Sequence, residues 1–206
     1  MPHYTTKDLC NIALVGQSSA GKTTLTEALL HKAGVITTPG KVESGNTVCD
    51  YDPLEKEYQH SLSASLVHFD YNKIHLNLID TPGYPDFIGH ALNVFTAVET
   101  VAVVVNAQAG IEMITRRMLE RAAQQKVCRM IIINKIDAPE LKLPQLVADL
   151  KDAFGDECLP INLPANQGEK VIDCFFNTTG DSDFGSVATA HTKIIDQVVE
   201  VDEALM

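Results

Sequence analysis

The chain has 206 residues, 45% hydrophobic and 21% charged, a composition typical of a globular protein with one full core and room for part of a second domain. Its net charge of −11 excludes nucleic-acid binding driven by the overall field of the chain, although a local basic patch is compatible with it. The N-terminus has no signal-peptide pattern, the longest aliphatic runs are too short for a bilayer, and the five cysteines lack zinc-site spacing. We therefore expect a cytoplasmic protein with free, mostly buried thiols.

A glycine-rich stretch follows the first apolar run. Residues 12–15 are predicted to form a buried strand, and residues 23–33 have near-helical apolar spacing. The stretch between them fits the phosphate-loop pattern Gly-x-x-x-x-Gly-Lys-Ser/Thr, whose backbone N–H groups and helix N-terminus point at phosphates. We expect Lys22 to reach the outer phosphates and the Thr23 hydroxyl to hold Mg²⁺. The residues predicted to contact the nucleotide here are Gly16, Gln17, Ser18, Ser19, Ala20, Gly21, Lys22, Thr23 and Thr24.

A second phosphate-binding motif ends a predicted hairpin. Residues 35–59 lack periodicity and are expected to form a long loop that is either functional or disordered. Strands are predicted at 62–71 and 73–79, with a tight turn near Asn72. The second strand runs into the sequence Asp80-Thr81-Pro82-Gly83. A carboxylate at the carboxyl end of a strand that faces a phosphate loop suits a Mg²⁺ site reached through water. Gly83 leaves room for its own N–H to approach a γ-phosphate.

The third motif selects a base. A helix is predicted at 85–97, a buried strand at 101–105, a helix at 112–125 with Met113 and Met118 as core residues, and a buried strand at 130–133. That strand leads into Asn134-Lys135-Ile136-Asp137. The Asp137 carboxylate can accept hydrogen bonds from N1–H and the amino group of guanine, and adenine has no N1–H. Asn134 would brace the loop and touch the base edge, and the stem of Lys135 would cover the ring face.

The remaining chain changes character. A helix at 144–154 completes an alternation of strands and helices, which predicts an α/β fold with a mostly parallel, doubly wound sheet and its ligand at the carboxyl ends of the strands. Residues 160–168 are loop-rich, 170–176 are predicted as a strand, 178–186 as a polar turn region and 188–205 as a helix.

These motifs resemble a known family. Residues 11–137, and above all Asn-Leu-Ile-Asp-Thr-Pro-Gly at 77–83 followed by Asp86 and Phe87, resemble the GTP-binding domain of elongation factor G and of translational GTPases generally. The resemblance implies a P-loop NTPase (Ras-like GTPase) three-layer fold, GTP or GDP with Mg²⁺ as ligands, GTP hydrolysis, and the ribosome as a partner of the full-length protein. It also implies a GTP-binding core at 1–157 and, at 158–206, a truncated part of the factor's inserted subdomain.

Three positions depart from the family pattern. Tyr84 stands where the family has the His that lines up the attacking water, so Tyr84 is either a catalytic residue of another chemistry or a cap on the site. The switch signature Arg-Gly-Ile-Thr-Ile falls on residues 58–62, where Ser61 keeps a hydroxyl for Mg²⁺ beside Thr23 and Asp80. Ser19 replaces an Asp of the phosphate loop, a change that could remove a monovalent-cation site. These departures resemble divergent elongation factor G-like paralogues.

Two other functions share these motifs. One is a GTP-sensing switch that hydrolyses little GTP and signals by loop order, which Tyr84 favours. The other is a ribosomal protection protein of the tetracycline-resistance type.

The family's base-capping Ser-Ala motif is not found after Asp137, so we expect an N-terminal fragment of a longer protein.

Overall fold

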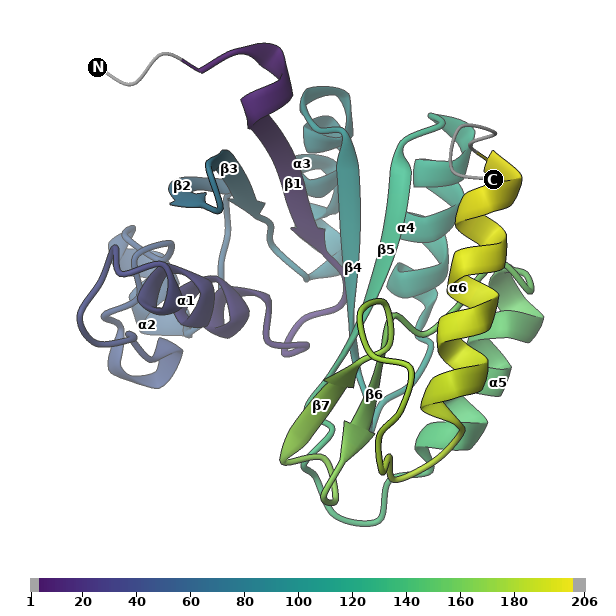
Figure 1. Cartoon of the computed structure of the whole chain (residues 1–206). Coiled ribbons are helices and arrows are strands. Elements are labelled where there is room, and N and C mark those ends of the chain that lie inside the picture. The colour runs from purple at the N-terminus through teal and green to yellow at the C-terminus, as the bar shows by residue number, and fades with distance from the viewer. Residues whose placement is uncertain (1–3, 202–206) are drawn as a thin grey trace. The chain divides into compact units, whose positions relative to one another are not determined.

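The computed structural model describes residues 4–201, and the chain divides into two compact units, Met1–Asn134 and Lys135–Met206. Each unit has its own sheet (Figure 1). The sequence predicts a different division, between a GTP-binding core at 1–157 and part of an inserted subdomain at 158–206. That division stays a prediction.

A five-stranded sheet in the order β2-β3-β1-β4-β5 forms the first unit. Only β2 is antiparallel to its neighbour, β3, and the other pairs are parallel. The strands are β1 (Leu9–Val15), β2 (Ser65–Tyr71), β3 (Ile74–Asp80), β4 (Thr100–Asn106) and β5 (Cys128–Asn134). The helices are α1 (Lys22–Lys32), α2 (Pro53–Tyr58), α3 (Ile88–Val94) and α4 (Met113–Gln124), with 3₁₀ turns at Thr6–Asp8, Val42–Ser44, Pro85–Phe87 and Phe95–Ala97. The predicted α/β fold with a mostly parallel sheet is confirmed.

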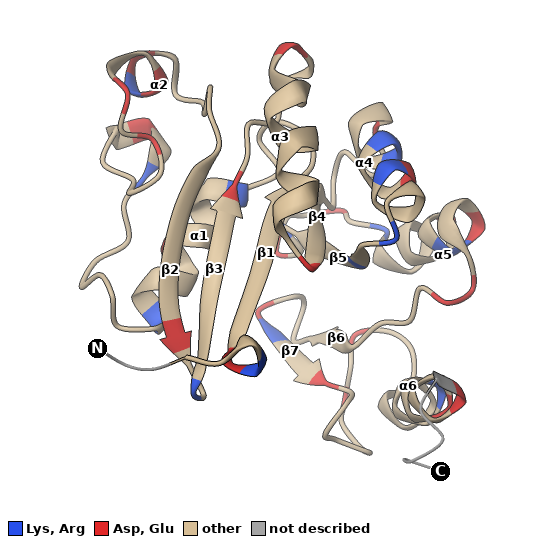
Figure 2. Ribbon diagram, turned by 90° about the horizontal axis from the view of Figure 1, so that it is seen from above, with Lys and Arg blue, Asp and Glu red and all other residues tan. Residues whose placement is uncertain are grey.

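Helices cover both faces of this sheet, with α1 on one side and α3 and α4 on the other (Figures 1 and 2). The middle of β4 is therefore buried on both faces, as its unbroken run of Val and Ala residues predicts. On the α1 side, Leu14, Ala102 and Val104 belong to one apolar cluster, against which Leu25 and Leu29 of α1 pack. This core holds the carboxyl ends of β1, β3 and β4 at one edge, where the polar motifs follow.

The segment predicted as a long loop at 35–59 contains the helix α2. Asp52 is its N-cap and accepts a hydrogen bond from Leu54 N at 2.8 Å, while Glu55 accepts one from Asp52 N at 3.2 Å. This reciprocal pair is a capping box, with Pro53 at the first helical position. The signal Asp-Pro-x-Glu was present in the sequence, and a prediction of loop throughout this segment was wrong.

A buried carboxylate of α1 holds the same segment in place. Glu27 is 1% exposed, and its two oxygens accept hydrogen bonds from Gly40 N at 2.7 Å and Val48 N at 2.6 Å. The segment is thus attached to the helix that follows the phosphate loop.

Several smaller expectations need correction. Met118 is buried as predicted, but Met113 begins α4 and is 79% exposed, because it lies outside the apolar face of that helix. The predicted helix at 85–97 is a short α-helix between two 3₁₀ turns. Of the cysteines, Cys49 and Cys174 are buried, whereas Cys128 is exposed and the other two are half-buried. The five described thiols form no disulfide, but most of them are not buried.

The second unit has a hairpin and two helices: α5 (Leu143–Phe154), β6 (Asn162–Ala165), β7 (Lys170–Asp173) and α6 (Val187–Val201). Strand β6 lies in the stretch predicted as loop, and a short two-stranded sheet tolerates its Pro164. The predicted strand at 170–176 ends at Asp173, and the predicted end of the last helix at 202–205 lies outside the described residues. Leu163 packs with Val187, Ala190 and Ile194, which form one stripe of α6 at helical spacing.

Charge is spread unevenly over the described surface. Figure 2 shows basic residues on α4, where Arg116, Arg117 and Arg121 occupy exposed positions despite the net charge of −11. Between residues 4 and 201, no helix combines the length and apolar character needed to cross a membrane.

The Glu27 contacts predict a local effect on stability. In Glu27→Gln, one of the two loop N–H groups would face an amide NH₂ in place of an acceptor. We expect a loss of about 1–3 kcal/mol in the free energy of unfolding, with faster hydrogen exchange at Gly40 or Val48. Glu43→Gln, at an exposed position of the same segment, is the matched control. Equal stability and exchange in the two variants would contradict this role.

Candidate functional site

The glycine loop joins β1 to α1 and encloses a lysine. Lys22 is 6% exposed, and its Nζ donates hydrogen bonds to Gly16 O at 3.0 Å and Gln17 O at 2.8 Å. Burial lowers the pKa of Lys22 to about 8, although the charge of Asp80 opposes the shift. The loop therefore holds a desolvated ammonium group beside its own backbone, which suits electrostatic binding of an anion.

The side chain of Gln17 points away from this lysine. Its Oε1 accepts a hydrogen bond from Thr115 at 2.9 Å, and its Nε2 donates one to Glu112 at 3.1 Å. These contacts attach the loop to the start of α4, so Gln17 offers its main chain to a ligand. Of the other predicted loop residues, Ser18 is half-buried, Ser19 and Thr24 are exposed and Ala20 is buried.

The motif after β3 lies directly against the loop. Thr81 Oγ1 donates to Leu14 O at 2.7 Å and fixes the turn to the end of β1, and Thr81 and Pro82 are buried. A Cβ atom built on Gly83 would lie 2.5 Å from both Ser18 N and Lys22 Nζ. Only glycine permits this approach, which brings the Gly83 main chain to the lysine that would bind phosphate.

Thr23 and Asp80 lie together with two residues that precede β2, Asp50 and Ser61. Thr23 Oγ1 donates to Asp80 Oδ2 at 2.6 Å, and Ser61 Oγ donates to Asp50 Oδ1 at 2.7 Å. The two hydroxyl oxygens are 3.4 Å apart. Because each hydroxyl gives its one hydrogen to a carboxylate, lone pairs of both oxygens are left for a cation.

The burial and charge of Asp80 also favour a cation at this cluster. Asp80 is 1% exposed and its Oδ1 is the buried side-chain atom that lacks a hydrogen-bond partner within residues 4–201. Burial and the charge of Asp50 raise the pKa of Asp80 to about 6, against the Thr23 hydrogen bond and the Lys22 charge. A buried carboxylate with one unpartnered oxygen, beside two hydroxyl oxygens, fits Mg²⁺, which prefers oxygen ligands.

No group of three His, Cys, Asp or Glu side chains able to hold a metal by themselves occurs in the described part of the chain. The fit to Mg²⁺ thus depends on the hydroxyl oxygens, with further ligands from water and phosphate, as is usual for this ion. Asp50 was missed by the sequence analysis, since it lies in an irregular segment and forms part of no local pattern.

The guanine motif begins at the end of β5. Asn134 Nδ2 donates to Ala20 O at 2.9 Å, so this side chain contacts the glycine loop. Gly21 has a φ of 93°, and a Cβ there would collide with the Asn134 amide. Lys135 and Asp137 are exposed and open the second unit in a turn, closed by Ala138 N donating to Lys135 O at 3.3 Å. Their contact with a base stays a prediction.

One of the three positions that depart from the resembled pattern, residue 84, is partly open to solvent. Tyr84 is 40% exposed, and its ring lies against the ring of His60, with centroids 4.5 Å apart. The sequence analysis did not single out His60. No local signal joins two residues that come together only when the segment before β2 meets the turn after β3.

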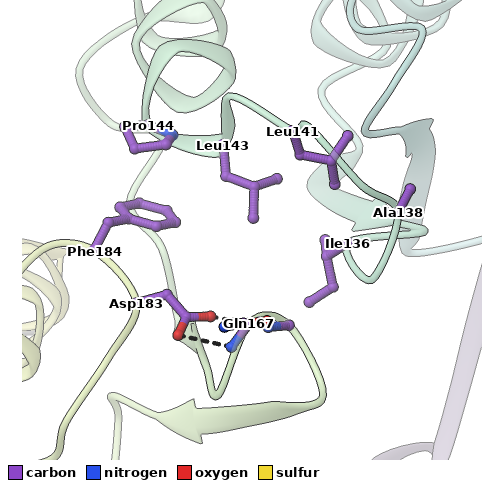
Figure 3. A pocket seen from close by; sticks show the side chains of 9 residues that line it. Ile136, Ala138, Leu141, Leu143, Pro144, Gln167, Asp183 and Phe184 are labelled. Atoms are coloured by element: carbon purple, nitrogen blue, oxygen red, sulfur yellow. Dashed lines mark hydrogen bonds between the residues drawn. The ribbon is translucent and has the colours of Figure 1, made fainter.

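The second unit contains a separate cavity of about 390 Å³ beside Ile136 (Figure 3). Leu141, Leu143 and Phe184 give it apolar walls. Its carboxylate, Asp183, already accepts hydrogen bonds from the N–H groups of Gln167 and Gly168, both at 2.9 Å. The cavity therefore has few polar groups left for a nucleotide.

A glycine loop between a strand and a helix, with a carboxylate at the end of a neighbouring parallel strand, defines a P-loop nucleotide-binding domain. Residues 7–204 match the family model described as the elongation factor Tu GTP binding domain. The chain belongs to this family, and its ligand is a guanine nucleotide.

Relatives narrow the family further. The chain is 34% identical over 209 aligned residues to an elongation factor G-like protein of Mycobacterium tuberculosis, covering 95% of this chain and 29% of that protein. It is 36% identical over 169 residues to the mitochondrial ribosome-releasing factor 2 of Drosophila melanogaster, covering 82% of this chain and 23% of that protein. A crystal structure of a Thermus thermophilus protein matches with a TM-score of 0.82 at 32% identity, covering 95% of this chain and 32% of that chain.

The chain thus spans less than a third of the length of these relatives. The predicted resemblance to the GTP-binding domain of elongation factor G-like GTPases is confirmed.

The close approach of Gly83 predicts a nucleotide-binding defect. In Gly83→Ala the new methyl group would collide with the glycine loop and push the Gly83 N–H from the γ-phosphate. We expect GTP affinity to fall about tenfold or more, equal to about 1.4 kcal/mol, with a smaller loss for GDP. Titration calorimetry measures both. Gly89→Ala, where a Cβ would meet nothing within 4 Å, is the control; equal affinities in the two variants would refute the contact.

Proposed function

We propose that this domain binds GTP and GDP together with Mg²⁺ and hydrolyses GTP, as part of an elongation factor G-like translation factor that acts on the ribosome. The observation that carries this proposal is the cluster of Thr23, Ser61 and Asp80, next to the lysine and to Gly83. Lys22 offers a positive charge for phosphate, and the cluster offers oxygen ligands for a cation at the same edge of the sheet.

The reaction needs little covalent chemistry from the protein. The oxygen of a water molecule bonds to the γ-phosphorus while the bond from that phosphorus to the β–γ bridging oxygen breaks, and the water protons leave with phosphate and solvent. Lys22 and the loop N–H groups, together with that of Gly83, would offset the charge on the phosphate oxygens. Catalysis by this chain would therefore come mainly from position and electrostatics.

Thr23 and Ser61 would hold Mg²⁺ through their hydroxyl oxygens, and Asp80 would hold it through water. When bound, the ion would neutralise charge on the β- and γ-phosphates. Asp50 would keep the Ser61 hydroxyl turned so that a lone pair faces the ion.

The attacking water would be placed by Tyr84 or by an outside partner. Tyr84 follows Gly83 in the chain, and its phenol can donate or accept a hydrogen bond but supplies no positive charge. One relative is called ribosome-releasing factor 2, a name that links that protein to ribosomes. This supports the ribosome as a partner of the full-length protein.

Base selection would fall to the motif at the end of β5. Asn134 supports the glycine loop through Ala20, and the Asp137 carboxylate would accept the two hydrogen bonds that guanine offers. The stem of Lys135 would cover the ring face.

A second candidate function is a GTP-sensing switch with little hydrolysis. Tyr84 favours it because the residue adds no positive charge. A single-turnover hydrolysis assay with and without ribosomes separates the two: a GTPase factor is stimulated by ribosomes, whereas a switch stays slow in both.

The first prediction from this proposal concerns the ligand. GTP and GDP should bind in the presence of Mg²⁺ and ATP should not, and Lys22→Ala should weaken GTP binding by about 1.5–3 kcal/mol through loss of a charge-assisted contact. Titration calorimetry is the measurement, with Lys32→Ala, an exposed lysine of the same helix, as control. Comparable affinities for ATP and GTP would refute guanine selection.

The second prediction concerns the base. In Asp137→Asn the amide would donate to the oxygen that xanthine carries where guanine has its amino group. We expect the preference to move from guanine toward xanthine nucleotides in competition binding, and Asp156→Asn, at another exposed aspartate, to leave it unchanged. If the ranking of the two bases stays the same, Asp137 does not touch the base.

A further inference from the structure

A histidine lies against Tyr84 at the edge of the phosphate site. The ring of His60 is 4.5 Å from that of Tyr84, centroid to centroid, at an interplanar angle of 47°, and 5.9 Å from the ring of Tyr58. His60 is half-buried. It follows α2 and precedes Ser61 in the chain.

The hydrogen bonding of His60 fixes its neutral tautomer. Nδ1 is 2.9 Å from Tyr58 O. A carbonyl oxygen can only accept, so Nδ1 carries the hydrogen, and in the neutral ring the lone pair is then on Nε2. Nε2 has no hydrogen-bond partner among residues 4–201. The ring thus presents an acceptor whose position is set by the Tyr58 carbonyl and the Tyr84 ring.

The chain neighbours of this ring pair belong to the phosphate site. Ser61, next to His60, lies 3.4 Å from the Thr23 hydroxyl through its Oγ. Gly83, next to Tyr84, lies against Lys22. The contact between His60 and Tyr84 therefore joins two chain segments of the site. One contains Ser61 of the hydroxyl cluster, and the other contains Gly83, which lies against the lysine.

We propose that His60 orients the attacking water, with Nε2 accepting a hydrogen bond from it and the Tyr84 ring serving as the support that keeps the imidazole in place. A water that gives one hydrogen to an acceptor on its far side turns a lone pair toward the phosphorus, which in-line attack requires. The inference rests on the proposed hydrolysis of GTP and names a residue that performs it.

The test compares three substitutions in the full chain. His60→Phe keeps a ring against Tyr84 but removes both nitrogens, and His60→Gln places an amide oxygen near the position of Nε2. His90→Phe makes the same change at an exposed histidine of α3 and serves as the control. Single-turnover hydrolysis of saturating GTP, the dissociation constant for GTP and the Mg²⁺ dependence are measured for each.

We expect His60→Phe to slow hydrolysis about tenfold or more while GTP affinity stays within about twofold, because water orientation affects the chemical step and not binding. His60→Gln should recover at least part of the rate, and His90→Phe should match the parent. Hydrolysis at the parent rate in His60→Phe would overturn the proposal. So would equal slowing in the Phe and Gln variants, or a loss confined to GTP or Mg²⁺ binding, since each indicates a structural role.

The two levels of the proposal fail differently. A parent chain that hydrolyses GTP while all His60 variants keep its rate removes only the role of His60. A parent chain that binds GTP and hydrolyses none, with or without ribosomes, removes the proposed activity and this role with it.

Discussion

Two hydroxyl groups, each of which donates its hydrogen bond to a carboxylate, determine the chemistry of this site. Thr23 donates to Asp80 and Ser61 to Asp50, and the lone pairs of the two oxygens are left 3.4 Å apart. Such an arrangement is electrostatically unfavourable unless a cation lies nearby. Burial, together with the charge of Asp50, raises the pKa of the neighbouring Asp80, and the charge of the buried Lys22 opposes that shift. The glycine loop, the end of β3 and the segment before β2 meet at these oppositely charged and polar side chains.

Local patterns predicted the parts of the fold that depend on local chemistry. The unbroken apolar run of β4 and the glycine loop after β1 are consequences of burial on two faces and of a backbone that must approach a ligand closely. Asp80 was expected at a strand end, which is where the structure has it. Helix α2 was missed although Asp52 and Glu55 form a capping box, because a helix of 6 residues has too few turns to show apolar periodicity.

Other features depend on contacts between distant residues and left no trace in the sequence. Asp50 and His60 lie in an irregular segment, and their partners, Ser61 and Tyr84, become relevant only in the folded chain. Strand β6 was hidden by Pro164, which argues against a central strand but is tolerated in a pair at an edge. Met113 was expected in the core from its apolar character alone, but it lies outside the face of α4 that Met118, Leu119 and Ala122 bury.

The two hydrogen bonds that Glu27 accepts, from Gly40 N and Val48 N, divide the segment after α1 into parts that differ in their tolerance to changes in length. Between Gly40 and Val48 the chain forms a small closed loop, with Lys41 N donating to Asn46 Oδ1 at 2.7 Å. Insertions within residues 42–45 would enlarge only this loop, at an entropic cost that grows slowly with length. Insertions after Val48 would instead shift Asp50 and Ser61 relative to Thr23. Relatives of this domain should therefore vary in length before Val48 and hold a constant number of residues from there to Ser61.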